Sequence, residues 1–217
     1  MRFAKLHGAG NDYIYVDARE ADNAGQDRDW AEVSRRVSDR HFGIGSDGLI
    51  LLRESDVADA RMQMFNADGS EGLMCGNGIR CLVRFGLDIN VLSWKRKSFD
   101  IETASGVLNV RPIWSEGQMT RASVSMGAPR LSASEIPVDV SDGDFGVLDY
   151  ALTVAGHELS LNCVSMGNPH AVAFLNDPIE GFPLTEVGPK VERSPIFPEG
   201  VNFEIVNVVD RLSLIHI

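Results

Sequence analysis

The sequence has little cysteine and little positive charge. Its 217 residues include three widely spaced cysteines, so a framework of disulfide bonds is not expected. Only 20 Lys and Arg stand against 31 Asp and Glu, and the net charge of −11 argues against a protein that binds nucleic-acid phosphates. The five histidines are scattered and no CxxC pair accompanies them, so the sequence predicts neither a metal site nor a metal cofactor.

Long hydrophobic runs are also missing. No apolar stretch approaches the roughly 18 residues of a membrane span, and the start, Met1 to His7, lacks the apolar segment of a signal peptide. We therefore expect a soluble, cytoplasmic protein with no membrane partner. A chain of this length buries roughly 70% of its unfolded surface, so its core needs no disulfide or metal.

Short apolar runs separated by Gly, Asn, Asp and Pro predict strands joined mostly by hairpin-length turns. This pattern favours an antiparallel or mixed sheet. A polar break at residues 115–118 predicts a domain boundary near residue 117. The expected strands cover residues 13–16, 49–52, 62–65, 99–103, 107–113, 122–126, 136–140, 150–154, 159–165, 171–175 and 201–209.

Two helices are predicted, and they differ in character. Residues 30–40 have one apolar face, which is typical of a surface helix. Residues 77–87 are apolar nearly all round, with Arg80 and Arg84 as a single polar stripe. A helix of the second kind must be enclosed, so the sequence predicts a sheet curled around a central helix.

The segment Gly43–Gly48 fits the pattern G-x-G-x-x-G of dinucleotide-binding loops. In such loops a strand precedes the glycines and a helix follows them. Here the predicted helix comes first and the strand 49–52 follows. We therefore interpret the glycines as a helix-to-strand turn and predict no nucleotide site.

Cys75 stands directly before Gly76–Gly78 at the start of the second predicted helix. Free backbone N–H groups there can hold a carboxylate, and the small residues let it approach the main chain. The same partial positive charge favours a thiolate. This combination suits removal of a proton next to a carboxylate, with the thiol as acid and base. The alternative is a structural cysteine, which is the role expected of Cys81 and Cys163.

Several amides and one histidine are further candidates. Asparagine is common in turns because it tolerates left-handed geometry, but turn-edge amides can also line a polar pocket for carboxylates and ammonium groups. His170, at the exit of the turn 166–170, is either an ordinary surface or core residue or one that orients a thiol or substrate. The asparagines in question are Asn11, Asn66, Asn77, Asn168 and Asn202.

Taken together, these segments resemble the diaminopimelate epimerase family. The resemblance covers residues 3 to about 210, and its motifs follow one another in the expected order. They are Lys5–Tyr13 (KLHGAGNDY), Arg40–Gly48 (RHFGIGSDG), Phe65–Glu71 (FNADGSE), Met74–Cys81 (MCGNGIRC), Ser165–His170 (SMGNPH) and Gly200–Phe203 (GVNF).

The resemblance implies a cofactor-independent isomerase of lysine and peptidoglycan precursor synthesis. Such an enzyme interconverts LL- and meso-2,6-diaminopimelate by moving the α-proton between two cysteines on opposite faces of the carbon. The implied fold is α+β, with two pseudo-symmetric lobes, each a mixed β-sheet curled around a central helix. The lobes would be residues 1–117 and 118–210, and the family hints at a homodimer.

The resemblance also assigns roles to residues of this chain. Cys75 would be a catalytic acid and base, with His170 as an auxiliary catalytic residue beside it. Gly76 and Asn77 would receive the reacting carboxylate. The other substrate-binding residues would be Asn11, Asn66, Asn168 and Asn202.

Two departures from the family pattern have consequences. Gly48 stands where some relatives carry Gln, so that contact is lost or replaced. Residues 211–217 do not resemble the family, which continues with an E-R-G segment and an A-C-G-[ST]-G block that carries the second cysteine and opens the second lobe's helix. We therefore expect an incomplete, poorly packed second lobe. We also expect an inactive chain, because one thiol returns the proton to the face from which it came.

Three alternatives stay open. The first is an enzyme similar to proline racemase or hydroxyproline epimerase, with the same fold and two thiols. The second is the phenazine-biosynthesis isomerase type, which lacks a cysteine at the position of Cys75. The third is a non-catalytic remnant that binds an amino-acid carboxylate at Gly76 and Asn77 and turns nothing over.

Overall fold

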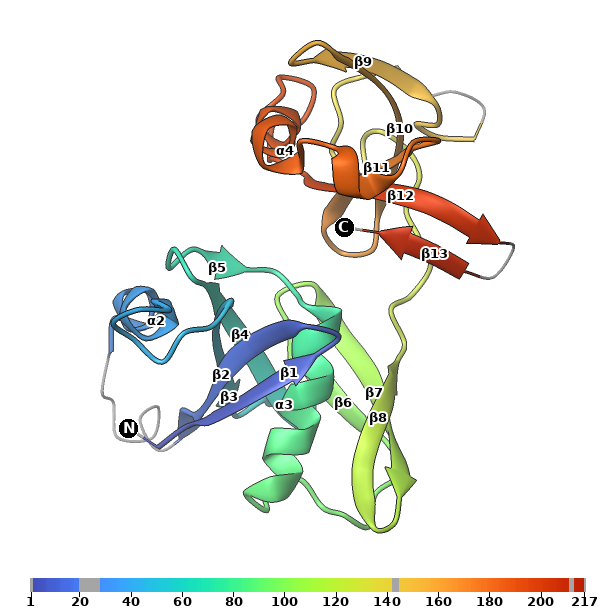
Figure 1. The fold of residues 1–217 in the computed structure, drawn as a ribbon. Coiled ribbons are helices and arrows are strands. Elements are labelled where there is room, and N and C mark those ends of the chain that lie inside the picture. Colours follow the sequence, from blue (N-terminus) through green and yellow to red (C-terminus); the bar gives the residue numbers. More distant parts are fainter. Residues whose placement is uncertain (1, 20–27, 142–144, 211–212, 217) are drawn as a thin grey trace. The chain divides into compact units, whose positions relative to one another are not determined.

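A computed structural model describes residues 2–19, 28–141, 145–210 and 213–216 (Figure 1). The chain divides into two compact units, Met1–Met126 and Gly127–Ile217. This division falls later than the boundary predicted near residue 117. The polar run there is instead a hairpin turn, in which Glu116 and Gly117 take φ angles of 51° and 76° between two paired strands.

The first unit is built on an eight-stranded mixed sheet with the order β1-β2-β3-β4-β6-β7-β8, and β5 pairs with β4. The pairs β2/β3 and β4/β6 are parallel and the others are antiparallel, so the predicted mixed sheet is confirmed. Its strands are β1 (Ala4–Gly8), β2 (Asn11–Asp17), β3 (Gly48–Arg53), β4 (Ala60–Asn66), β5 (Glu71–Gly72), β6 (Phe99–Thr103), β7 (Gly106–Ser115) and β8 (Gln118–Val124).

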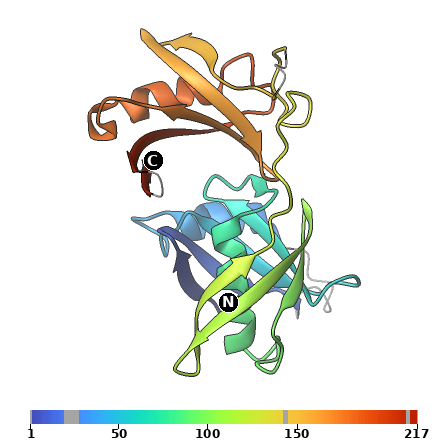
Figure 2. The ribbon, with the colours of Figure 1, turned by 90° about the vertical axis from the view of Figure 1, so that its right-hand side faces the viewer.

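The helix α3 (Gly76–Asp88) lies inside the curve of this sheet (Figures 1 and 2). It packs against β1, β2, β3, β7 and β8. Its side chains Ile79, Leu82 and Val83 are fully buried in the main core of the unit, together with Tyr15 and Phe99. Full burial of one such aliphatic side chain stabilises a fold by about 1.5–3 kcal/mol, so several of them hold the helix in place. The enclosed helix predicted from residues 77–87 is confirmed.

The helix α2 (Trp30–Ser38) covers the opposite face of the sheet, against β3 and β4. Asp29 caps it by accepting a hydrogen bond from the Glu32 backbone N–H at 2.9 Å. Side chains alternate along β3, so Leu49 and Leu51 face α2 while Ile50 and Leu52 join the α3 core. Residues 39–47 connect α2 to β3, which confirms the helix-to-strand interpretation of the glycine-rich segment.

The second unit has a five-stranded sheet with the order β13-β12-β11-β10-β9, in which β11 and β12 are parallel. The helix α4 packs against β9 and β12 (Figure 1). Its elements are β9 (Tyr150–Val154), β10 (His157–Ser165), β11 (Pro169–Phe174), the 3₁₀ turn η1 (Ile179–Gly181), α4 (Leu184–Glu192), β12 (Asn202–Asp210) and β13 (Ser213–His216).

The second unit is packed, contrary to the expectation of a poor core. Val187 and Val191 of α4 are fully buried in one cluster with Ile205 of β12 and Leu161 of β10. The sequence analysis missed α4 because Gly and Pro189 lie inside it, and both residue types disfavour helices. No helix of the described residues is long and apolar enough to cross a bilayer.

The segment 136–140 and the tail of the chain differ from what the sequence predicts. The strand predicted at residues 136–140 is wrong: this segment forms turns in which the Ile136 and Val138 N–H groups donate to carbonyls of residues 132 and 133. Both side chains are nevertheless buried, which explains the strand-like alternation. In the predicted tail, the backbone of β13 pairs with β12, while residues 211, 212 and 217 lie outside the described residues.

Candidate functional site

Cys75 is the N-cap of the enclosed helix α3. Its extended backbone (φ −137°, ψ 113°) turns the chain into the helix, and its Sγ accepts a hydrogen bond from the Gly78 N–H at 3.3 Å. The Ile79 N–H donates to the Cys75 carbonyl at 2.9 Å. Among the described residues, the N–H groups of Gly76 and Asn77 have no hydrogen-bond partner, so they are available to an anion.

The two glycines beside Cys75 differ in the space around them. A Cβ on Gly76 would meet only the Met126 side chain, at an ordinary 3.7 Å, so its surroundings are open. A Cβ on Gly78 would lie 2.6 Å from Cδ1 of the fully buried Ile50 and 3.6 Å from the Cys75 sulfur. Gly78 is therefore required for close packing under the thiol, whereas Gly76 leaves room for a ligand.

Two tyrosines of β2 lie against the same end of α3. Burial, and then the neighbouring Cys75 sulfur, raise the pKa of Tyr13 above its usual range. The Tyr15 hydroxyl donates to the Gly78 carbonyl at 3.2 Å, and burial raises its pKa as well. Both phenols thus stay protonated near neutral pH, and they present O–H groups rather than charges to the thiol end of the helix.

Asn11 and Asn77, both predicted from the sequence, are brought together. The Asn77 Nδ2 donates to the Asn11 Oδ1 at 2.5 Å, and the Arg80 guanidinium donates to the Asn77 Oδ1. These two hydrogen bonds link the start of β2 to the first turn of α3. It places two amides and one cation next to Cys75, a set that suits a carboxylate ligand.

An ion-pair network supports the turn that carries Asn11. The Arg40 Nη2 lies 2.7 Å from the Asp12 Oδ1 and 2.9 Å from the Asp47 Oδ1, and the Asp12 N–H donates to the Asp47 Oδ2. The Arg40 hydrogen bond is the main reason that the pKa of Asp12 lies well below its usual range. At Gly48, which follows, a Cβ would lie 2.2 Å from the Phe65 carbonyl oxygen. The Gln found there in some relatives therefore has no space in this backbone.

Asn66 is placed differently from the other amides of the first unit. It ends β4, is exposed, and donates through Nδ2 to the Ser70 Oγ at 3.0 Å within its own turn. No contact with Cys75 is recorded for it among the described residues. Its predicted role in substrate binding stays a prediction.

The second unit collects three more predicted residues where β11 and β12 begin. His170 and Asn202 are partners in the parallel register, and the Asn202 Nδ2 donates to the Pro169 carbonyl at 2.9 Å. The His170 Nε2 lies 3.1 Å from the Asn168 Oδ1, and its Nδ1 lies 2.6 Å from Glu204 Oε1. The sequence analysis missed Glu204; its place two residues after Asn202 on the same strand is the signal that could have found it.

Of the other two cysteines, Cys163 lies in the interior, as predicted, whereas Cys81 is only partly buried. Cys163 on β10 is 2% exposed, and burial raises its pKa to about 11. Cys81 packs against the α3 core, and burial raises its pKa too.

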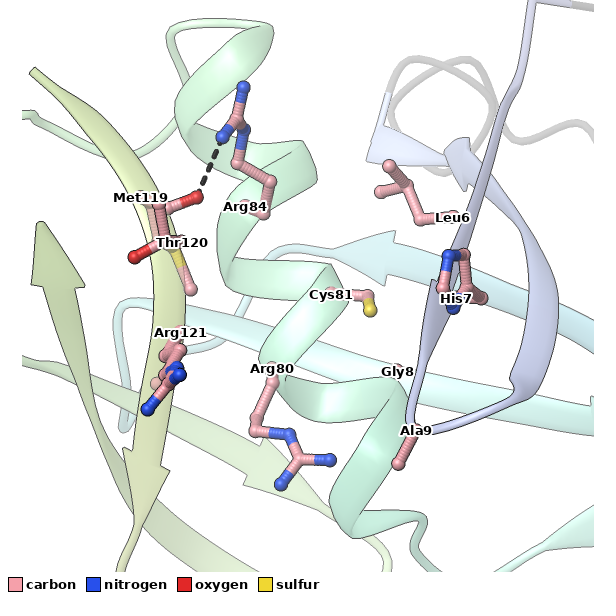
Figure 3. A pocket seen from close by; sticks show the side chains of 11 residues that line it. Leu6, His7, Gly8, Ala9, Arg80, Cys81, Arg84, Met119, Thr120 and Arg121 are labelled. Carbon is pink, nitrogen blue, oxygen red and sulfur yellow. Dashed lines mark hydrogen bonds between the residues drawn. The ribbon is translucent and has the colours of Figure 1, made fainter. Parts of the chain in front are cut away.

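A groove of about 410 Å³ runs beside α3, between β1 and β8 (Figure 3). Arg80, Cys81 and Arg84 line it from the helix, and the Arg84 Nη1 donates to the Met119 carbonyl at 2.8 Å. Figure 3 shows the Cys81 side chain directed toward β1, and Cys75 is not among the lining residues. The groove thus reaches Arg80, the hydrogen-bond partner of Asn77, but not Cys75 itself.

Comparison with solved structures defines the fold class. A probable proline racemase from Agrobacterium radiobacter K84, with bound carbonate, matches with a TM-score of 0.66 and 15% identity over 98% of this chain and 68% of its own. A hydroxyproline epimerase from Agrobacterium vitis, with bound trans-4-hydroxy-L-proline, gives 0.61 and 17% over 94% and 65%. The chain thus shares its fold with these two proteins.

Comparison of sequences defines the family. The family model for diaminopimelate epimerase matches residues 3–132. The diaminopimelate epimerase of Acetivibrio thermocellus is 43% identical over 99% of this chain and 73% of its own length, and that of Geobacillus kaustophilus is 43% identical over 98% and 71%. The chain belongs to the diaminopimelate epimerase family, as the motifs predicted, and is an isomerase that works without pyridoxal phosphate.

Proposed function

We propose that Cys75 acts as the acid and base that moves the α-proton of 2,6-diaminopimelate between its LL and meso forms. The observation that carries the proposal is the position of its sulfur at the N-terminus of an enclosed helix. That sulfur accepts from the Gly78 N–H, and the N–H groups of Gly76 and Asn77 remain available beside it. A carboxylate bound to those groups would bring its α-carbon next to the sulfur.

Removal of the α-proton requires groups that bind the neighbouring carboxylate while negative charge develops on it. When the α-proton leaves, negative charge develops on the carboxylate oxygens, and preorganised N–H donors stabilise that charge most strongly. Asn77 and Arg80, which are already hydrogen-bonded to each other, add side-chain donors to the backbone groups. Asn11, Asn66, Asn168 and Asn202 are proposed to bind the rest of the diamino diacid, with His170 as an auxiliary group.

We further propose that these 217 residues exchange the α-proton but do not invert the carbon. Inversion needs a base on one face and an acid on the other. Of the other two cysteines, Cys163 is buried and Cys81 is partly buried, and burial raises the pKa of each, which disfavours the thiolate. A single acting thiol takes the proton and returns it to the same face.

We also propose that the protein acts in the cytoplasm as a homodimer. Light scattering on the purified chain would test the dimer.

The experiment is solvent deuterium uptake. The purified chain is incubated in D₂O with LL- and, separately, meso-diaminopimelate, and both the label at the α-carbon and its configuration are followed. We expect label to enter with retention, and Cys75→Ser to lower the uptake by about a thousandfold, within the range of general acid–base catalysis. Cys81→Ser is the matched control and should keep the wild-type rate.

Two results would contradict parts of the proposal. Full uptake in Cys75→Ser would remove that thiol from the reaction. Inversion by the wild-type chain at the rate of an intact family member would show that a second acid is present. Binding of substrate without any exchange would favour the non-catalytic alternative.

A further inference from the structure

The strand β12 carries near its start a carboxylate, that of Glu204, which the proposed function does not use. The Glu204 Oε1 lies 2.6 Å from the His170 Nδ1, so the ring donates its Nδ1–H to the carboxylate. The other oxygen, Oε2, is buried and has no hydrogen-bond partner among the described residues. A buried carboxylate oxygen without a hydrogen bond is costly unless an adjacent cation offsets its charge. His170 is the group in contact that can supply this cation.

The second nitrogen of the ring faces another acceptor. The His170 Nε2 lies 3.1 Å from the Asn168 Oδ1, and an amide oxygen only accepts hydrogen bonds. A ring whose two nitrogens both face oxygen atoms is satisfied when both nitrogens carry a proton. Because the Asn168 oxygen is engaged by the ring, its Nδ2 group is left to donate elsewhere.

The backbone explains why these three side chains meet. His170 of β11 is the register partner of Asn202 on the parallel strand β12, and Val172 is the partner of Glu204. His170 and Glu204 are therefore diagonal neighbours, within reach of each other's side chains. Asn168 precedes β11 by one residue, after Gly167 with a φ angle of 108°, so the turn directs it toward the ring.

We propose that Glu204 is a positioning residue. Its carboxylate holds the His170 ring with both nitrogens donating, and the ring in turn fixes the Asn168 amide with its NH₂ group free for a substrate carboxylate. The proposal rests on the proposed function for the identity of the ligand, an amino-acid carboxylate. The ring geometry itself does not depend on it.

The first experiment reads the ring directly. The full chain is labelled with ¹⁵N, and the two ring nitrogens of His170 are observed by NMR at neutral pH. The wild type should show the similar shifts of two protonated nitrogens. Glu204→Gln should separate them into one protonated and one unprotonated nitrogen, and Glu204→Asp, which keeps the charge, should restore the wild-type pattern in part. Glu158→Gln, an exposed glutamate of β10, is the matched control and should change nothing.

The second experiment measures binding of meso-diaminopimelate by calorimetry. Glu204→Gln should weaken binding by about tenfold, the effect of one charge-assisted hydrogen bond. Asn168→Ala should weaken it similarly, and the double variant should be little weaker than either single one, since both act through one donor.

The outcomes separate the two proposals. An unchanged ring spectrum in Glu204→Gln overturns the positioning role. If that variant does not fold, the wild-type spectrum decides alone, because an unprotonated Nδ1 or Nε2 would contradict the two-donor ring. If the ring behaves as expected but the wild type binds no diaminopimelate, the positioning role stands and the proposed substrate fails.

Discussion

The two units of the chain hold their candidate residues in different ways. In the first unit, Cys75 and Asn77 occupy the first turn of a helix that is enclosed by strands and capped by the cysteine itself. In the second unit, His170 and Asn202 stand on neighbouring parallel strands. The helix there, α4, has no side-chain cap at its N-terminus and carries Pro189 inside it.

This difference has a chemical meaning. A helix N-terminus can support a thiolate or a carboxylate only if its N–H groups keep a fixed direction, and enclosure on several sides provides that rigidity. Residues on paired strands are positioned by register instead, so their geometry depends on cross-strand contacts such as that between His170 and Glu204.

The largest expected effect concerns the thiols. Burial raises the pKa of Cys163 from an ordinary 9.0 to about 11, so its thiolate fraction at pH 7.5 is about a hundredfold lower than that of an unshifted thiol. Cys75, which is only partly buried at the N-terminus of α3, should react with iodoacetamide about a hundredfold faster than the buried Cys163 in the folded chain. Mass spectrometry of the labelled peptides checks this. In urea, where both thiols are exposed, the two labelling rates should converge. Comparable rates for the two cysteines in the folded chain would contradict the prediction.

More of the candidate site could be predicted from the sequence in the first unit than in the second. The all-round apolar pattern of residues 77–87 predicted the enclosed helix because burial on every side removes polar residues from every face. Cys75 followed from its position before Gly-Asn-Gly. Spacing could not show that Arg40 supports the turn of Asn11, since the two lie far apart in the chain and meet only through the pairing of β2 with β3.

The second unit shows why local patterns fail. Leu184, Val187 and Val191 have helical spacing, but Gly and Pro between them obscure it, and tertiary packing overrides the weak local propensity. The buried pair Ile136 and Val138 alternates like a strand and yet lies in turns. Glu204 was missed because its partner, His170, belongs to another strand, and register is not visible in one sequence.

The same substitution in the two helices should have unequal effects on stability. Val83 of α3 and Val187 of α4 are both fully buried. Val83→Ala should cost about 3 kcal/mol of unfolding free energy and Val187→Ala about 2, because an enclosed helix relaxes less into the cavity that is left. Hydrogen exchange, read separately for residues of each unit, measures both losses. A larger loss for Val187→Ala would show that α4 is the more tightly held helix.

A smaller effect separates the two glycines at the thiol. Gly78→Ala places a methyl group 2.6 Å from Ile50 Cδ1 and should destabilise the first unit by about 2 kcal/mol. Gly76→Ala meets only ordinary contacts and should be neutral or slightly stabilising, since alanine favours helices. Denaturant unfolding gives both values. Gly76→Ala should still weaken diaminopimelate binding, because its methyl group occupies the side from which a carboxylate approaches; unchanged binding would place the ligand elsewhere.

The smallest effect tests the network behind Asn11. The pKa of Asp12 is lowered chiefly by its hydrogen bond to Arg40, so folding gains stability at pH values above the unfolded pKa of about 3.9 and loses it as the pH falls toward the lower folded value. Arg40→Gln should therefore lower the free energy of unfolding slightly at pH 7, because solvent screens this exposed pair, and the difference from the wild type should shrink below about pH 4. Arg121→Gln, which removes an exposed charge from β8 outside this network, is the control. Two results would show that packing, and not the ion-pair network, holds the turn of Asn11. One is a loss of stability in Arg40→Gln that does not change with pH, and the other is an equal loss in Arg121→Gln.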